Sequence, residues 1–432
     1  MNKTYICIDL KSFYASVECV ELGLDPMTTD LVVADPERSG NTICLAITPA
    51  MKAKGIRNRC RVFEIPKSVK YIMAPPRMQL YIDYAANIYA IYLEYISKDD
   101  IHVYSIDEVF IDASTYLDLY NISAKDFANK LMGEVYDRLG VRATAGIGTN
   151  MYLAKIALDI TAKHSPDFIG VLDEKTYIET LWDHLPLTDF WRMGPGTVNR
   201  LAKYGIYTMR DIAKTDEDFL YRIFGIDAEL MIDHAYGIEP TTIAEIKKYV
   251  PRTNSLCSGQ VLMSDYEFED GCLIVKEMMD LLCLDLVDRK VVAHSISLVI
   301  GYSNSYALEA AKGTVKLPHP TSADVTIMPL IEKLYREIVD PQFPIRRVNI
   351  ICNNLVPEDE AVEEYTQMSL FDDDEEKQKL TLEEEKNKKI QEAVLSIKNK
   401  YGKDAVLKAM NLEEKAMTIK RNHQIGGHKS GV

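Results

Sequence analysis

The stretch IHVYSIDEVFID at residues 101–112 sets two adjacent carboxylates, Asp107 and Glu108, between two runs rich in β-branched and aromatic residues. This pattern predicts two strands joined by a tight turn at Asp107-Glu108. Neighbouring residues in a regular strand point to opposite faces of the sheet, so adjacent carboxylates reach one site only where the strand turns or breaks. A two-residue hairpin loop would supply that break.

A third carboxylate, Asp9, ends the apolar run TYICID at 4–9, which is typical of a short buried strand. If this strand lies beside the hairpin at 101–112, the three carboxylates converge. Buried carboxylates without cations repel one another, which raises their pKa values. Divalent metal relieves that repulsion, and carboxylate oxygens suit Mg²⁺. From the residues alone, the pattern fits a two-ion metal site and a solvated turn equally.

The rest of the chain divides by its periodicity. Residues 13–20, 81–95, 123–139 and 150–163 have helical spacing, and 141–148 reads as a strand, which together predict a ferredoxin-like α+β unit. Residues 169–237 are helical and turn-rich, and 245–355 mix strands with helices. We therefore expect a multidomain α+β protein, followed by a segment without apolar period at 357–381 and a helical segment at 382–411.

Composition limits the class of protein. The 432 residues are 47% hydrophobic and 27% charged, as in a soluble globular protein, and no apolar run approaches the length of about 18 residues that spans a membrane. The eight cysteines include no CxxC pair, which favours a reducing cytoplasm over disulfides or zinc. Ten acidic residues between Glu358 and Glu376 account for most of the net charge of −15 and leave about −5 for the body. This acidity does not exclude DNA binding, but it predicts a localised DNA-binding surface.

Three segments carry a family resemblance: DLKSFYASVE at 9–18, SIDEVFID at 105–112 and GIGTNMYLAKIA at 146–157. They resemble successive motifs of the Y-family (translesion) DNA polymerases, in order and in spacing. The resemblance runs from about residue 4 to 355 and is closest to the UmuC or DNA polymerase IV-like subgroup of Gram-positive type.

The resemblance implies a right-hand polymerase with five parts. These are a ferredoxin-like palm at 1–21 and 78–168, small fingers at 22–77, a helix-hairpin-helix thumb at 169–237, an α+β little finger at 245–355, and an acidic, partly disordered tail at 356–432.

The resemblance also assigns the catalytic residues. Asp9, Asp107 and Glu108 match the catalytic carboxylates, which together with the Leu10 carbonyl would bind two Mg²⁺ ions. Tyr14 matches the steric gate that excludes a ribose 2′-hydroxyl, and Phe13 would stack under the sugar. Without the resemblance, core packing is the simpler interpretation of Phe13 and Tyr14.

Two lysines are candidates for binding the triphosphate of the incoming dNTP. Lys52 lies where the fingers present a cation, but many members have Tyr three residues before Arg, whereas this chain has Pro49 and Lys52. A lysine at this position offers the phosphate a single point charge, whereas an arginine offers two parallel N–H donors. Lys163 falls one residue later than the usual spacing, and a solvated helix end is the alternative interpretation. Lys155 is expected to be structural or to face the template.

Other residues are candidates for binding primer-template DNA or a sliding clamp. Gly194-Pro195-Gly196 opens a helix that Gly205 ends, so free N–H groups at Gly194 and Gly196 could bind a phosphate. Seven basic residues are DNA-binding candidates, with ordinary surface charge as the alternative: Lys247, Lys248, Arg252, Lys312, Lys316, Arg346 and Arg347. The motif at 367–371 resembles the clamp-binding pentapeptide of bacterial polymerases, with Gln367 at a pocket rim and Leu370 and Phe371 in an apolar cleft.

The expected function is template-directed addition of dNTPs to a primer end opposite damaged DNA, with low fidelity and no proofreading. One alternative is a catalytically weak paralogue acting as a DNA- and clamp-binding repair scaffold. Another is a different palm enzyme such as a nucleotidyl cyclase, which would need neither a hairpin thumb nor a clamp motif. UmuD-like or recombinase accessory proteins are further possible partners.

Overall fold

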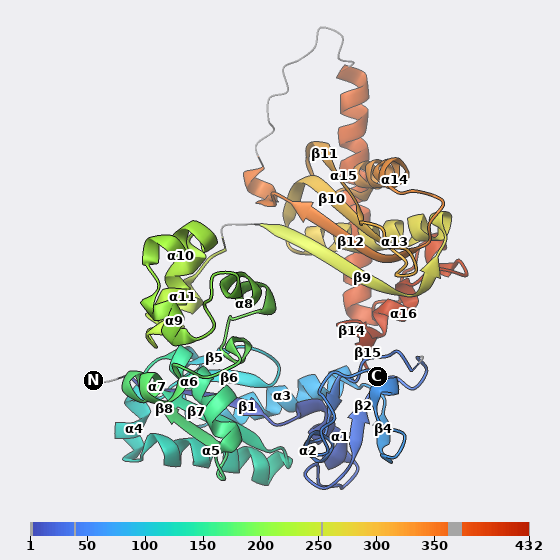
Figure 1. The fold of residues 1–432 in the computed structure, drawn as a ribbon. Coiled ribbons are helices and arrows are strands. Elements are labelled where there is room, and N and C mark those ends of the chain that lie inside the picture. Colours follow the sequence, from blue (N-terminus) through green and yellow to red (C-terminus); the bar gives the residue numbers. More distant parts are fainter. Residues whose placement is uncertain (1–2, 39, 252–253, 362–373, 432) are drawn as a thin grey trace. The chain divides into compact units, whose positions relative to one another are not determined.

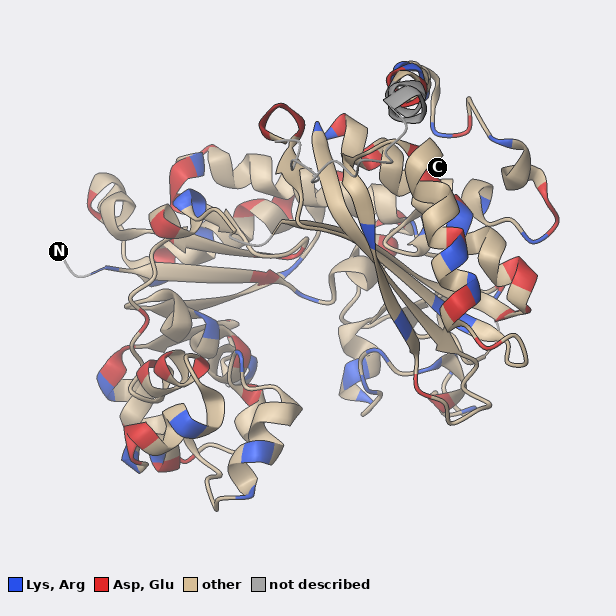
Figure 2. Ribbon diagram, turned by 90° about the horizontal axis from the view of Figure 1, so that it is seen from above, with Lys and Arg blue, Asp and Glu red and all other residues tan. Residues whose placement is uncertain are grey.

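The computed structural model describes residues 3–38, 40–251, 254–361 and 374–431 (Figure 1). The chain forms two compact units, one made of Met1–Tyr249 with Lys429–Val432 and the other of Val250–His428. Figure 2 shows basic and acidic residues interspersed along the helices, whereas the strands carry few charges. None of the described helices combines the length and apolar character that a membrane crossing requires.

The first unit is built on a five-stranded sheet in the order β5-β6-β1-β7-β8. Its strands are β1 (Tyr5–Leu10), β5 (Ile101–Val103), β6 (Glu108–Asp112), β7 (Ala143–Gly148) and β8 (Ile169–Leu172). β1 pairs antiparallel with both β6 and β7, which puts the two acidic motifs on neighbouring strands as expected. β8 pairs parallel with β7, so the sheet extends four residues past the palm boundary expected at residue 168.

Helices cover both faces of this sheet. Successive residues of β1 point to opposite faces and are therefore buried on both sides. α6 (Met151–Ile156) packs on the face that carries Tyr5 and Cys7. α3 (Met78–Leu93) lies over Ile8 and Leu10 on the other face and contacts α5 (Ala124–Leu139). α1 (Phe13–Glu21) follows β1 directly, and α4 (Ser114–Tyr120) follows β6.

Residues 22–77, the expected fingers, contain a small three-stranded sheet in the order β3-β2-β4. Its strands are β2 (Leu31–Val33), β3 (Ala46–Ile47) and β4 (Ile72–Ala74), and α2 (Pro49–Ala53) follows β3. Gly55 ends this helical turn with φ +79°, a conformation that favours glycine. The core of this segment is small and includes Val32, Ile47 and Met51.

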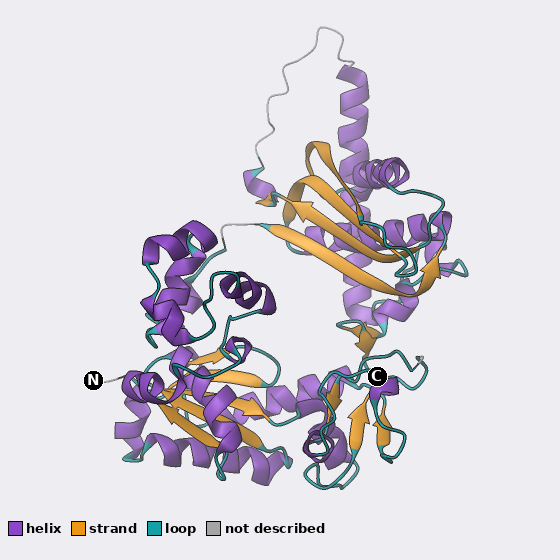
Figure 3. Cartoon of the chain, in the orientation of Figure 1, coloured by secondary structure: helices purple, strands orange, loops and turns teal. Residues whose placement is uncertain are grey.

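Residues 174–248 are helical (Figure 3). The helices are α7 (Glu174–Leu181), α8 (Pro195–Ala202), α9 (Met209–Lys214), α10 (Glu217–Phe224), α11 (Asp227–Ala235) and α12 (Ile243–Lys248). As predicted, Pro195 opens α8 after Gly194, and Gly205 (φ +77°) ends the turn that follows. Thr208 caps α9. α12 lies in the first unit, where Ile243 is buried beside β1, although we expected the little finger to begin at residue 245.

The second unit is a four-stranded antiparallel sheet in the order β11-β10-β12-β9, with β13 (Val356–Pro357) paired to β10. The strands are β9 (Ser255–Tyr266), β10 (Val291–Tyr302), β11 (Ala311–Thr321) and β12 (Ile345–Asn353). α13 (Phe268–Asp288) and α14 (Asp324–Ile338) pack on the face where Leu298 and Ile350 are buried. The opposite face carries basic side chains such as Arg347 and Lys312 together with exposed apolar ones such as Val261.

The described residues 374–428 also belong to the second unit. α15 (Asp374–Tyr401) packs against α13 and α14, and α16 (Thr418–Asn422) follows. Glu277 of α13 is 2% exposed, and its carboxylate accepts hydrogen bonds from Asn411 Nδ2 (3.0 Å) and from the backbone N–H groups of Met417 (2.7 Å) and Thr418 (3.1 Å). These three bonds satisfy a buried charge, so the segment after α15 is an integral part of this unit. β14 (Gln424–Ile425) and β15 (His428–Lys429) then form a short hairpin.

Candidate active site

Asp9 and Glu108 lie opposite each other on neighbouring strands. Asp9 of β1 pairs directly with Glu108 of β6, which sets both side chains on the same face, the face of Cys7. Glu108 is buried, and its two carboxylate oxygens accept hydrogen bonds from Cys7 Sγ (3.2 Å) and Lys155 Nζ (2.8 Å). Glu108 is therefore a strand residue with a fixed direction.

Asp107 reaches the same region from a loop. The backbone N–H groups of Tyr104 and Ser105 both donate to the Glu108 carbonyl, so the connection spans 104–107. The tight turn predicted at Asp107-Glu108 is thus wrong, because pairing with Asp9 makes Glu108 the first residue of β6. Asp107 lies just outside the strand, where the alternation of side chains no longer applies.

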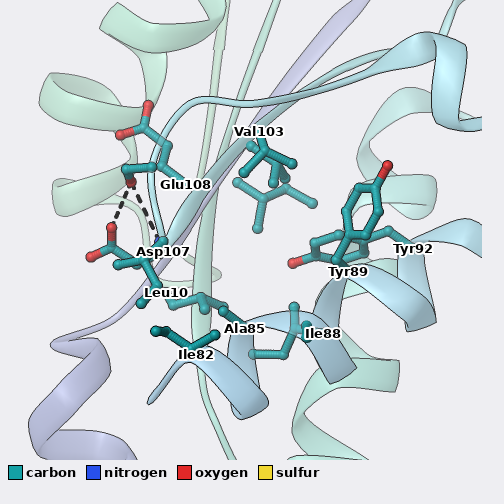
Figure 4. Close-up of a pocket in the computed structure, with 14 residues that line it drawn as sticks. Leu10, Ile82, Ala85, Ile88, Tyr89, Tyr92, Val103, Asp107 and Glu108 are labelled. Carbon is teal, nitrogen blue, oxygen red and sulfur yellow. Dashed lines mark hydrogen bonds between the residues drawn. The ribbon is translucent and has the colours of Figure 1, made fainter. Parts of the chain in front are cut away.

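Asp107 is held by two neighbours. Its carbonyl accepts from the Leu10 N–H (2.9 Å), and its Oδ1 accepts from Ser105 Oγ (2.7 Å). Figure 4 shows this arrangement beside Leu10, next to a mainly apolar cavity of about 360 Å³. The cavity is lined by side chains of α3, β1 and the 103–109 segment, including Ile82, Tyr89 and Tyr92. The two hydrogen bonds, and not close packing on the cavity side, hold the Asp107 loop in place.

The electrostatics of the three carboxylates are those of a shared site. Burial raises the pKa of Asp9 to about 7, and the charges of Asp107 and Glu108 add to the rise while Lys155 opposes it. Burial also raises the pKa of Glu108, against the hydrogen bonds from Lys155 and Cys7. The single positive charge of Lys155 thus only partly neutralises the three carboxylates. A divalent cation that prefers oxygen ligands suits these side chains.

The three carboxyl groups are not gathered into a closed ligand shell. Across the described ranges, no three His, Cys, Asp or Glu side chains lie close enough to enclose a metal ion. Glu108 is turned towards Lys155, whose ammonium also contacts Asp159 (3.2 Å) one helical turn further on. The structure therefore brings Asp9, Asp107 and Glu108 to one end of β1 and gives Glu108 a lysine partner.

Lys155 was expected to be structural or to face the template, and its burial agrees with the structural interpretation. Its contact with Glu108, one of the candidate carboxylates, was not predicted. Burial disfavours its charge, but Asp159 and Glu108 outweigh burial and raise its pKa, so it remains an ammonium. The i, i+4 spacing of Lys155 and Asp159 is the signal that could have indicated an ion pair on a helix.

Phe13 and Tyr14 open α1 directly above this end of β1. Ser12 adopts φ 51°, which turns the chain from the strand into the helix. Phe13 is buried, whereas Tyr14 is half-buried and stacks on Tyr81 of α3 with ring centroids 4.5 Å apart and planes 15° apart. Burial raises the pKa of the Tyr14 hydroxyl and the Asp107 carboxylate adds to the rise, so the ring lies on the Asp107 side of the site.

Lys52 lies near Asp9 and near Lys163. Burial lowers the pKa of Lys52, the charge of Asp9 opposes that change, and the charge of Lys163 adds to it. The late position of Lys163 has a structural cause: α6 continues into a π-helical turn at Ala157–Thr161, which accommodates one extra residue. In the part of the chain that the structure describes, neither lysine is ion-paired.

Lys11 is a further cation at this end of β1. Its Nζ lies 4.0 Å from the centroid of the Phe168 ring, a cation–π contact. Burial lowers its pKa, and the charges of Lys52 and Arg142 add to that effect.

The remaining candidates are dispersed. Gly194 and Gly196 are exposed at the start of α8, and no described atom lies within 4 Å of the place where a Cβ would be at either residue. Lys247 and Lys248 end α12 in the first unit, where Lys247 donates to the Lys98 carbonyl. In the second unit Arg346 pairs with Asp265 (3.2 Å), whereas Arg347, Lys312 and Lys316 lie on the open face of the sheet. Arg252, Gln367, Leu370 and Phe371 fall outside the described residues.

Comparison with known proteins identifies the family. Residues 8–159 match the family described as impB/mucB/samB, and residues 254–370 match the C-terminal domain of the same family. The chain belongs to the impB/mucB/samB family. It is 30% identical to "Putative UV-damage repair protein UvrX" of Bacillus subtilis (strain 168), over 99% of this chain and 98% of that protein. It is 28% identical to "DNA polymerase IV 2" of the same organism, over 99% of both chains.

The fold of this impB/mucB/samB member is that of a solved polymerase. A Y-family DNA polymerase chimera matches 82% of this chain and 99% of its own length, with a TM-score of 0.63 and 19% identity. The expected multidomain α+β fold and the expected Y-family membership, of the Gram-positive DNA polymerase IV type, are both confirmed.

Proposed function

We propose that this protein is a translesion DNA polymerase that adds dNTPs to a primer end opposite damaged templates, with Asp9, Asp107 and Glu108 as its catalytic carboxylates. The observation that carries the assignment is the convergence of these residues at the end of β1, where burial raises the pKa of Asp9 to about 7 and the charges of Asp107 and Glu108 add to the rise. The scaffold alternative is not favoured, because full-length relatives are named DNA polymerases.

The carboxylates are suited to divalent metal, on which catalysis by this family depends. Asp9, Asp107 and Glu108, with the Leu10 carbonyl, would hold two Mg²⁺ ions. When bound, such ions supply activation of the primer hydroxyl and neutralisation of the charge on the leaving pyrophosphate. Lys155 orients Glu108 through the 2.8 Å bond between Nζ and Oε2, and Ser105 orients Asp107. Both act as positioning residues.

The sugar of the incoming nucleotide would lie against Phe13 and Tyr14. The Tyr14 ring is supported from behind by Tyr81, so it cannot retreat from a 2′-hydroxyl. Phe13 is fixed by burial and would support the sugar ring. This arrangement suits selection of deoxyribose by exclusion.

Lys52 and Lys163 would bind the triphosphate. We expect Lys52→Ala to raise KM for dNTPs about tenfold or more, as loss of a charge-assisted contact does, while Lys52→Arg keeps most of the binding. Lys54→Ala is the matched control, since Lys54 lies two residues along, is exposed and pairs with Asp30. Steady-state primer extension over a dNTP series measures the effect, and equal KM values for the Lys52 and Lys54 variants would remove Lys52 from this role.

DNA would be bound through its backbone. Exposed N–H groups at Gly194 and Gly196 suit one phosphate, and Arg347, Lys312 and Lys316 share the open face of the second unit's sheet. Three further basic residues are proposed to contact DNA phosphates. They lie close to the point in the sequence where the first unit ends: Lys247, Lys248 and Arg252. Arg346 contributes less, because its charge is already paired with Asp265.

The motif at 367–371 is proposed to bind the sliding clamp. Replacing Leu370 and Phe371 by Ala is expected to abolish clamp-stimulated synthesis and leave clamp-free synthesis intact, because only the apolar anchors are lost. A control variant replaces Leu382 and Ile390, two exposed apolar residues of α15. Primer extension with and without clamp separates the outcomes; equal stimulation of both variants contradicts the proposal.

Primer extension tests the overall assignment. Purified protein with Mg²⁺ and dNTPs is expected to extend a primer on an undamaged template and past a template lesion. A protein that adds no nucleotide to either template, while still binding primer-template DNA, would favour the scaffold alternative.

A further inference from the structure

The short segment Lys429–Gly431 lies on the first unit where the fingers meet α3. Lys429 Nζ contacts Glu37 (2.6 Å) and Asp35 (3.5 Å), both in the loop after β2. The Ser430 carbonyl accepts a hydrogen bond from the backbone N–H of Gln79 (2.9 Å) in the first turn of α3. The segment thus joins the fingers loop to the start of α3.

The bond to Gln79 supplies a hydrogen-bond acceptor for the first turn of α3. The first N–H groups of a helix have no partner within the helix and are usually capped by a side chain. Arg77 occupies the capping position, and within the described chain its side chain makes no capping bond to α3. Ser430 provides that acceptor from a distant part of the sequence.

Gly431 packs directly on Arg77. It adopts φ +83°, and a Cβ at this position would lie 2.8 Å from the Arg77 Cα and 2.8 Å from the Arg77 Cβ. Atoms this close cannot coexist without displacement, so the contact requires glycine. The segment therefore holds Arg77 by direct contact as well as through the helix end.

Arg77 is the first member of a chain of contacts that ends at Tyr14. Its guanidinium donates two hydrogen bonds to Glu18, from Nε to Oε1 (3.1 Å) and from Nη2 to Oε2 (2.6 Å). Glu18 is 3% exposed and accepts a third bond from the Tyr81 hydroxyl (2.6 Å). Tyr81 in turn stacks on Tyr14.

We infer that Lys429, Ser430 and Gly431 form a positioning element for the sugar gate, acting through Arg77, Glu18 and Tyr81 on the ring of Tyr14. The inference rests on the proposed role of Tyr14 and assigns a selectivity function to a segment more than 400 residues away in sequence. A loosened Arg77 leaves Glu18 buried with fewer partners, so Tyr81 and the ring stacked on it lose their fixed position.

A pair of glycine variants isolates the contact. Gly431→Ala and Gly426→Ala both add a Cβ at positive φ (+83° and +59°), but the described chain has no atom within 4 Å of the added Cβ at Gly426. We expect Gly431→Ala to lower the preference for dNTP over rNTP, as a ratio of kcat/KM values, by about threefold to tenfold, the loss of roughly one hydrogen bond. Gly426→Ala is expected to keep the parental ratio.

A second pair removes the ion pair without altering the backbone. Lys429→Ala is expected to lower the same ratio and Lys429→Arg to preserve it, with kcat for the correct dNTP changed less than twofold in all variants. Equal ratios for Gly431→Ala and Gly426→Ala, together with a parental ratio for Lys429→Ala, overturn the inference. If Tyr14→Ala itself leaves the ratio unchanged, the gate assignment fails first, and the inference fails with it.

Discussion

We expect Asp107→Ala to lower kcat/KM for primer extension by roughly a thousandfold or more, because several kcal/mol of stabilisation by metal-held charge would be lost. Of the three carboxylates, Asp107 is the one that lies outside the strands of the sheet. It lies in a loop, its side chain accepts one bond from Ser105, and its carbonyl bond to Leu10 does not involve the side chain. The substitution therefore removes a ligand and leaves the sheet intact.

Asp112→Ala is the matched control for this expectation. Asp112 lies at the other end of β6, paired with Tyr5, and its carboxylate accepts bonds from Ser114. It should keep polymerase activity near that of the parent. Primer extension under single-turnover conditions, with binding of primer-template DNA measured in parallel, makes the comparison. Comparable rates for both variants contradict the catalytic assignment of Asp107.

We expect Tyr14→Ala to raise incorporation of ribonucleotides relative to deoxyribonucleotides by about tenfold to a hundredfold. As the proposed gate, the ring would occupy volume that a 2′-hydroxyl needs, and forcing an extra group into a packed site costs about 1–3 kcal/mol. Tyr14→Phe keeps the ring and its stacking on Tyr81, so it should keep the parental selectivity. The ratio of kcat/KM values for matched dNTP and rNTP substrates measures the effect. Unchanged selectivity in the Ala variant removes Tyr14 from the gate.

Features encoded by neighbouring residues were predictable from the sequence. The helix opened by Gly194-Pro195 and the turn at Gly205 depend on local backbone preferences, and both are confirmed. The two runs that form β1 and β6 were predicted as strands, and their pairing was the condition for the carboxylates to converge; the structure shows that pairing. Turn residues and the spacing of apolar residues are enough to predict such elements.

Features set by distant partners were not predictable in this way. The turn before β6 is placed by the pairing of Glu108 with Asp9, about a hundred residues away, and no local pattern specifies that register. The ion pair of Lys155 was not predictable because its partner, Glu108, lies on β6, 47 residues away in the sequence. The π-helical turn at Ala157–Thr161 has no composition signal, although it accounts for the displaced Lys163. The segment after residue 373 lacked an assigned function because its anchors, such as Glu277, are side chains of another helix.

The fold of that last segment changes how residues 362–373 are connected. Before them, β13 pairs with β10, and after them α15 packs on α13 and α14, all within the second unit. The described chain on both sides of residues 362–373 therefore belongs to one unit. Cleavage of the chain between Ala361 and Asp374 would leave the two parts associated through the packing of α15 on α13 and α14.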